Sequence, residues 1–132
     1  EWVDLDATSD VPVLCEIPAN APPEVLVCPT DFTLVGSMCY HIGPDPFTWD
    51  ESVQYCHNAA PLATNPKLAE FKKEEELQTV IEEYLVELCN GCNRCWWIGA
   101  EDRRLSENYF NFEWVSSHYP ITYNSWAPNR PA

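Results

Sequence analysis

Seven cysteines in a chain of 132 residues constrain this sequence more than any other feature. Such a density is typical of extracellular domains that are stabilised by disulfides, and it is unusual in cytosolic proteins. Because the number is odd, at least one thiol must stay free or pair with another chain. The length suits one domain with one hydrophobic core. We therefore expect a secreted, single-domain protein stabilised by disulfides.

The charge of the chain excludes two classes of partner. The formal net charge is −14, and only seven Lys and Arg residues are present, scattered along the chain. Nucleic acids and anionic membranes are bound by clustered basic side chains, so neither is expected as a partner. No apolar run approaches the length of about 18 residues that a membrane span needs, so no membrane span is expected.

The first half of the chain predicts a strand, a spacer and a hairpin. The β-prone, mostly apolar stretch 11–17 predicts a short buried strand, and the proline-rich stretch 18–24 predicts an extended linker. Two β-rich runs around a Val-Gly-Ser turn predict a hairpin within 25–42.

Two helices are expected next. The first, at 47–60, begins with the capping box formed by Thr48 and Glu51. The second is expected over 65–88, with Asn65 as its cap, Pro66 in its first turn and a stripe of apolar residues at helical spacing.

Beyond the helices, an apolar strand is expected from Trp96 to Ala100. A half-buried strand is expected at 109–115, where Phe110, Phe112 and Trp114 alternate.

Taken together, the order and spacing of these features resemble the long form of the C-type lectin-like domain. The residues that carry the resemblance are Cys28-Pro29, Phe32, Cys39-Tyr40, Trp49, Ser52, Tyr55-Cys56, Leu62-Ala63, the second helix, Trp97-Ile98-Gly99, Asp102, Phe112-x-Trp114, Tyr123-x-x-Trp126 and Pro128. The resemblance implies an α+β fold, with two helices, two small antiparallel sheets, a long loop region that carries ligand sites, and disulfides that stabilise it.

The first residues of the chain look like the end of such a domain. In the family a strand of the type Glu-x-Cys-Val-x-Leu and a last strand ending in Cys and often Glu follow the tryptophan-proline loop. Here 1–5 resembles the first, with Trp2 in the place of the cysteine, and 13–16 resembles the second. The expected organisation is therefore 1–17 as C-terminal strands, 18–24 as linker and 25–132 as the main body.

Three explanations stay open for this order. The chain is one period of a tandem array, or a fragment that exchanges strands with neighbouring copies, or a true circular permutant. In the first two, 1–17 complete a neighbouring domain, and in the third they complete their own.

The resemblance also implies disulfide pairings. It pairs Cys28 with Cys39 and Cys15 with Cys56, and it implies that a third family bridge is absent because Trp2 replaces one partner. The remaining cysteines, Cys89, Cys92 and Cys95, are spaced as C-x₂-C-x₂-C. This spacing is compatible with a metal site, but no fourth ligand lies nearby. One local disulfide plus one free or intermolecular thiol is the preferred interpretation, and no metal or other cofactor is expected.

The sugar site of the family is expected to be lost. Calcium-dependent sugar binding in the family uses Glu-Pro-Asn or Gln-Pro-Asp, and the aligned triplet here is Arg130-Pro131-Ala132. A guanidinium replaces a carboxylate that should bind calcium.

Enzyme activity is not expected either. His41, His57 and His118 lie far apart without a neighbouring Ser or Cys motif, so each is interpreted as an ordinary polar surface group.

Two functions of different classes remain. The first is a structural or adhesive repeat that assembles with other copies of itself into filaments or multimers through shared strands and disulfides. The second is a secreted, calcium-independent recognition module for a glycan, protein or mineral surface. For either function the predicted contact residues are Trp96, Tyr109, Tyr119, Tyr123 and Arg130, and Trp97, Trp114 and Trp126 are assigned to the core.

Overall fold

The fold was determined as a computed structural model. It describes residues 2–19, 28–60, 65–86, 96–102 and 112–126. Several predicted features lie outside these residues: cysteines 89, 92 and 95, Tyr109, and the triplet 130–132 with Arg130. Of the linker predicted at 18–24, only residues 18 and 19 are described.

The main sheet has four strands in the order β2-β3-β1-β4. They are β1 (Leu14–Pro18), β2 (Thr33–Val35), β3 (Met38–Ile42) and β4 (Lys67–Leu68). The strand β1 pairs antiparallel with both β3 and β4, so it is a central strand. The hairpin predicted within 25–42 is confirmed as β2 and β3, with Gly36 at a φ of 64° in its turn, a conformation that glycine adopts at no steric cost.

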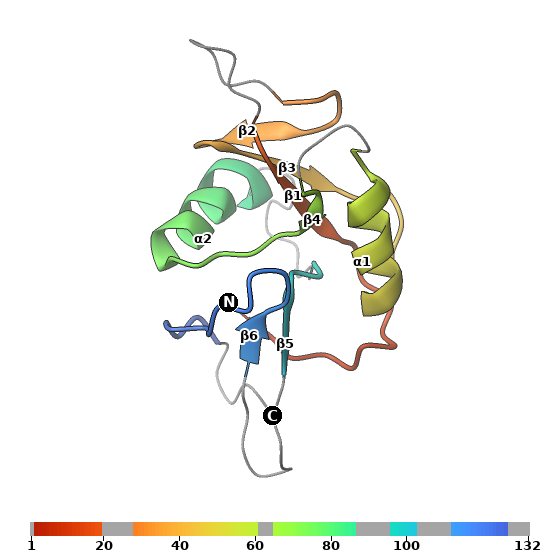
Figure 1. Ribbon diagram of the computed structural model, residues 1–132, viewed down its shortest axis with the longest axis vertical. Coiled ribbons are helices and arrows are strands. Elements are labelled where there is room, and N and C mark those ends of the chain that lie inside the picture. The colour runs from red at the N-terminus through yellow and green to blue at the C-terminus, as the bar shows by residue number, and fades with distance from the viewer. Residues whose placement is uncertain (1, 20–27, 61–64, 87–95, 103–111, 127–132) are drawn as a thin grey trace.

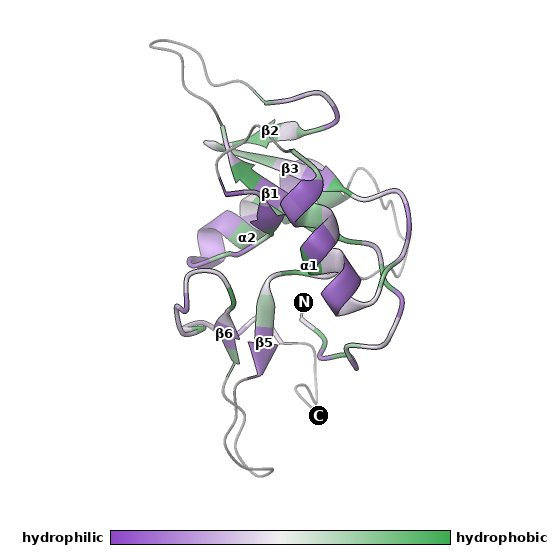
Figure 2. Cartoon of the chain, turned by 45° about the vertical axis from the view of Figure 1, so that its right-hand side comes forward, coloured by the Kyte–Doolittle hydropathy of each residue, from purple (hydrophilic) through white to green (hydrophobic). Residues whose placement is uncertain are grey.

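The helices flank this sheet. The first, α1 (Trp49–Asn58), has the predicted capping box, in which the Thr48 hydroxyl accepts from the Glu51 N–H and the Glu51 carboxylate accepts from the Thr48 N–H. The second, α2 (Glu74–Val80), continues as one π-helical turn, η1 (Ile81–Leu85). Figure 2 shows hydrophobic residues along the central strands and hydrophilic residues over much of the two helices.

The predicted start of the second helix at residue 65 is wrong. Asn65 has a φ of 50°, which an extended N-cap does not have. Lys67 and Leu68 form β4 instead, and the Ala69 N–H donates to the Leu14 carbonyl, so the segment continues along β1. Leu68, Ala69 and Phe71 are buried against the sheet, so pairing with β1 outweighed the helical spacing of the apolar residues.

The second sheet consists of β5 (Ala100–Asp102) and β6 (Phe112–Trp114). The strand predicted from Trp96 to Ala100 therefore lies later, because Trp97 makes a single bridge to Val13 and the ladder begins only at Ala100. Gly99 passes close to β4, where a β-carbon would lie 3.0 Å from the Leu68 carbonyl oxygen.

The molecule has two parts that differ in their strands and in their stabilising contacts (Figure 1). The sheet half comprises β1 to β4 and α1. The aromatic half comprises β5, β6, Trp2 and residues 119–126. In the sheet half Cys15 is bonded to Cys56 and Cys28 to Cys39, as the resemblance implied.

In the aromatic half, Trp2 is buried among Trp114, Tyr123 and Trp126, at ring-centroid distances of 6.1, 4.9 and 5.4 Å. The Trp2 N–H donates to the Ser125 carbonyl at 2.6 Å.

Candidate functional site

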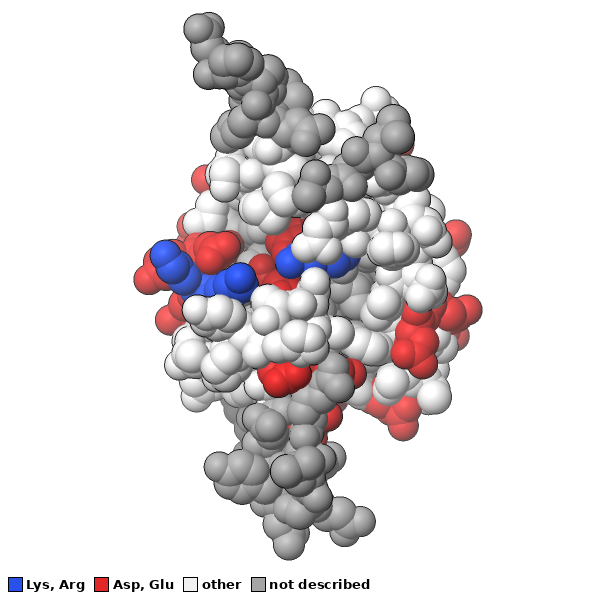
Figure 3. Space-filling view, in the orientation of Figure 1, with Lys and Arg blue, Asp and Glu red and all other residues white. Residues whose placement is uncertain are grey.

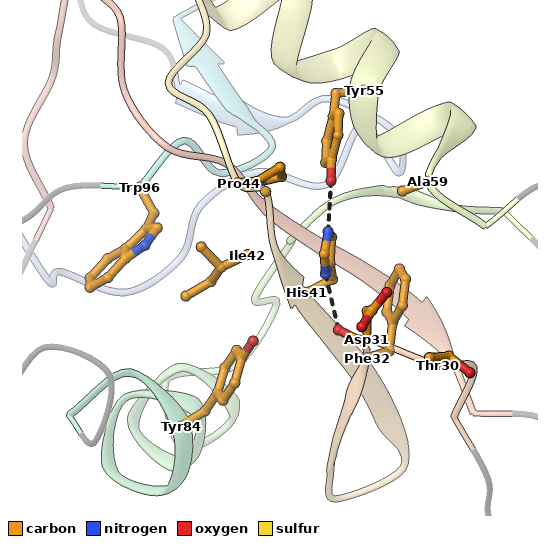
Figure 4. Close-up of a pocket in the computed structure, with 11 residues that line it drawn as sticks. Thr30, Asp31, Phe32, His41, Ile42, Pro44, Tyr55, Ala59, Tyr84 and Trp96 are labelled. Atoms are coloured by element: carbon orange, nitrogen blue, oxygen red, sulfur yellow. Dashed lines mark hydrogen bonds between the residues drawn. The ribbon is translucent and has the colours of Figure 1, made fainter.

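An open groove of about 690 Å³ runs past the C-terminal end of β3. Its lining comes from the segment before β2, from β3 and the residues after it, from α1, from η1 and from Trp96. Figure 4 shows two ends to this groove. His41 and Tyr55 lie together with Asp31 and Phe32, whereas Tyr84 and Trp96 lie on the other side, next to Ile42. His41 and Ile42 are consecutive in a strand, so their side chains point to opposite faces.

His41 is held from two sides. Its Nδ1 lies 3.0 Å from the Asp31 carbonyl oxygen and its Nε2 lies 2.7 Å from the Tyr55 hydroxyl. The ring also stacks on Phe32, with centroids 5.0 Å apart. His41 was interpreted as an ordinary polar surface group, and the structure adds that it is half-buried and has a partner at each ring nitrogen.

The hydrogen bonds define what this end of the groove offers a ligand. A carbonyl oxygen only accepts, so Nδ1 carries the ring proton and donates to Asp31. With one proton on the ring, Nε2 then accepts the Tyr55 O–H. The Tyr55 oxygen keeps its acceptor capacity, and the exposed Asp31 carboxylate adds two acceptor oxygens.

The surroundings of the groove are acidic. Burial raises the pKa of the Tyr55 hydroxyl, and the carboxylates of Asp45 and Asp31 raise it further. The Lys and Arg residues within the described part of the chain are Lys67, Lys72 and Lys73, and none of them lines the groove. Figure 3 shows these basic residues surrounded by acidic side chains on one face of the molecule.

Three of the five predicted contact residues lie in the described part of the chain. Trp96 lines the groove and is half-buried. Tyr119 is 54% exposed and its ring lies 5.0 Å from the Lys72 ammonium. Tyr123 is half-buried, contacts Trp2 and donates its hydroxyl hydrogen to the Phe71 carbonyl, so part of its side chain belongs to the fold. Tyr109 and Arg130 lie outside the described residues.

The groove itself was not predicted from the sequence. Its polar end combines residues 31, 41 and 55, which form no local motif. The sequence does contain one indication that His41 lies near residues 28–32. Cys39 and His41 are two positions apart in the predicted strand, so their side chains share a face. The Cys28–Cys39 pairing then brings residues 28–32 toward that face.

A second polar cluster is buried where the sheet half meets the aromatic half. Glu16 and Glu70 are 3% and 5% exposed, and the Lys67 ammonium lies 3.8 and 3.9 Å from one oxygen of each. Glu70 accepts from the Ser116 N–H at 2.7 Å and from the Ser117 hydroxyl at 2.8 Å. Burial raises the pKa of Glu16 to about 8 despite the opposing effect of Lys67.

This cluster joins the two halves but is closed to ligands. The ammonium of Lys67 occupies the position between the carboxyl groups. In the described ranges no group of three His, Cys, Asp or Glu residues is arranged to hold a metal ion. The helices within those ranges are also too short and too polar to cross a membrane.

The architecture and its disulfides define the class of the fold. Two helices, two small antiparallel sheets and the pairs Cys15–Cys56 and Cys28–Cys39 make it a disulfide-stabilised α+β fold of the C-type lectin-like type.

Comparison with known proteins supports this class. The chain is 28% identical over 107 residues to the C-type lectin TsL of the snake Trimeresurus stejnegeri. The aligned part covers 79% of this chain and 60% of the length of that relative. No family model matches the chain, and no solved structure matches it significantly.

Proposed function

We propose that this chain is a non-enzymatic extracellular recognition module that binds its ligand without calcium. The observation that carries the proposal is the groove at the end of β3, an open cavity of about 690 Å³ with aromatic walls and a few polar groups at one end. Sites for small molecules combine aromatic and apolar walls with a few polar groups in this way.

Several features support the individual parts of the proposal. The similarity to a C-type lectin favours recognition over catalysis. The four cysteines of the described ranges are all in disulfides, which form in oxidising compartments. His41 uses both ring nitrogens in hydrogen bonds to Asp31 and Tyr55, and neither partner is a nucleophile of the Ser or Cys type.

The test of this function is binding of the oxidised protein to arrays of glycans and peptides and to mineral surfaces, each with calcium and with EDTA. We expect a specific interaction that EDTA leaves unchanged. Mannose or galactose binding that requires calcium would contradict the proposal.

A second function, assembly with other copies, is favoured by the position of β1. This strand is central in the sheet, yet it comes from the first 18 residues and is followed by a proline-rich linker. If residues 1–17 of one copy entered the sheet of the next, every contact of β1 would be kept, as in domain swapping. The bond between Cys15 and Cys56 would then link neighbouring copies covalently.

Assembly of this kind predicts multimers that are linked covalently and that separate in denaturant only after reduction. Size analysis with and without reductant, and with and without EDTA, distinguishes the two functions. A monomer under all conditions would contradict assembly and leave the recognition module intact.

A further inference from the structure

The groove at the end of β3 carries an inference about the chemistry of its ligand, and this inference rests on the recognition function proposed above. Three properties of the groove determine this chemistry: its free hydrogen-bonding groups, the charges around them and the apolar residues at its opposite end.

The polar end has unused acceptors. In the neutral ring, His41 Nδ1 donates to the Asp31 carbonyl and His41 Nε2 accepts from the Tyr55 hydroxyl. Tyr55 and Asp31 both line the groove, and the Tyr55 oxygen and the Asp31 carboxylate can each accept further hydrogen bonds. A ligand therefore meets acceptors here and must supply the donors.

The charge around this end favours a cation. Asp31 lines the groove, and Asp45 is close enough to influence the Tyr55 hydroxyl electrostatically. No Lys or Arg among the described residues lines it to compensate these carboxylates. Phe32 lies beside Asp31, and aromatic rings attract cations through their faces.

The other end of the groove is apolar. Ile42, Tyr84 and Trp96 lie together there, and all three are half-buried (Figure 4). Burial raises the pKa of the Tyr84 hydroxyl, and its hydrogen bonds to the Thr33 side chain and the Ile42 backbone oppose that rise. Since these bonds engage the hydroxyl, the ring of Tyr84 is left mainly for apolar contact.

We propose that this groove binds a basic segment of a partner protein. An arginine or lysine side chain places its charge beside Asp31 and the Tyr55 oxygen, and apolar residues of the same segment contact Ile42, Tyr84 and Trp96. Arginine suits the polar end better, because its planar guanidinium donates several hydrogen bonds and stacks on aromatic rings.

The test is an NMR titration of the isotope-labelled, oxidised chain with two peptides. Acetyl-Leu-Gly-Arg-amide carries the charge, and the same peptide with citrulline in place of arginine has nearly the same shape without it. We expect the arginine peptide to shift the resonances of His41, Tyr55 and the Trp96 indole, and the citrulline peptide to bind about fivefold more weakly.

Two variants test the assignment of residues. Asp31 has a φ of 72°, a conformation that asparagine also tolerates, so Asp31→Asn removes the charge and keeps the turn. This variant is expected to weaken the arginine peptide about fivefold and to leave the citrulline peptide unchanged. The matched control is Asp10→Asn, which removes an exposed carboxylate outside the groove and leaves both affinities unchanged.

Three results would overturn the inference. They are equal binding of both peptides, equal effects of the two aspartate variants, or shifts of the groove resonances by simple sugars in place of the arginine peptide. If Asp31→Asn binds the arrays in EDTA as strongly as the unmodified protein does, the recognition function holds and the ligand site lies elsewhere.

Discussion

The sheet half holds both disulfides found in the described part of the chain, whereas the aromatic half is held by packing around Trp2. Trp2 shows the difference between disulfide and aromatic stabilisation most directly, because the resemblance places a cysteine at this position. In its place Trp2 contacts Trp114, Tyr123 and Trp126.

The two means of stabilisation act on different states. A disulfide acts mainly by restricting the unfolded chain. Aromatic packing acts in the folded state, through buried area and ring contacts. Reductant should therefore lower stability by giving the unfolded chain more freedom, and truncation of one indole should lower it by removing contacts from the folded core.

The largest effect is expected for Trp2→Ala. Loss of this buried indole should lower the free energy of unfolding by about 3–5 kcal/mol, as for other large aromatic residues in a core. Trp2→Phe keeps a ring in the cluster and should cost less than half as much. Urea denaturation measures both, with Val3→Ala as control because Val3 is 37% exposed. A Trp2→Ala loss below about 1 kcal/mol, within the range of ordinary surface changes, would refute the role given to the cluster.

Removing the disulfides should have the next largest effect. Replacing Cys15 and Cys56 by alanine should cost about 2–4 kcal/mol. The pair Cys28–Cys39 spans 11 residues against 41 for Cys15–Cys56, so its removal should cost about 1 kcal/mol less in the chain-entropy description. Thermal unfolding of both double variants tests the order, and a reversed order would show that loop length does not govern the difference.

The junction between the halves predicts a pH dependence. The pKa of Glu16 is raised to about 8 in the folded protein, above its usual value near 4.5. The folded state then binds the proton of Glu16 more tightly than the unfolded state does, so the stabilisation that protonated Glu16 contributes is fully present below pH 4.5 and is lost as the pH rises through about 8.

Glu16→Gln removes this titration. Relative to the unmodified protein, the variant should gain on the order of 4 kcal/mol in unfolding free energy between pH 5 and pH 9. Urea denaturation across that range measures the gain. The control Glu83→Gln removes an exposed carboxylate from η1. A pH-independent difference between Glu16→Gln and the unmodified protein would contradict the assigned role of burial.

The smallest effect is expected within α1. Thr48→Ala removes the hydroxyl that accepts from the Glu51 N–H and should cost about 1 kcal/mol. Amide hydrogen exchange should accelerate in the first turn of α1 and remain unchanged in β6. Equal acceleration in both places would mean that the two halves unfold together.

The features that were predicted from the sequence are mostly those with local signals. Thr48 and Glu51 mark the start of α1, and the Val-Gly-Ser turn marks the hairpin of β2 and β3. The pairings of Cys15 and Cys28 followed from the resemblance. The start of the second helix was missed because Lys67 and Leu68 pair with a strand about 50 residues earlier, and no local pattern reveals that pairing.

The groove was also missed because its residues are far apart in the sequence. Asp31, His41 and Tyr55 come from three separate elements, and only the fold brings them together. The predicted contact residue Trp96 does line the groove, but Tyr119 contacts Lys72 and Tyr123 packs on Trp2. The prediction based on aromatic loop residues therefore includes Trp96 from the apolar end of the groove and no residue from its polar end.

The central claim is that β1 pairs within the sheet of its own chain, so that the groove forms within one copy. Oxidative refolding of an equal mixture of ¹⁵N-labelled and unlabelled chains, followed by mass spectrometry of the Cys15–Cys56 peptide, tests it directly. The account predicts disulfide-linked peptides in which both halves are labelled or both are unlabelled. A substantial fraction of mixed peptides would show that the strand is exchanged between copies and would contradict the claim.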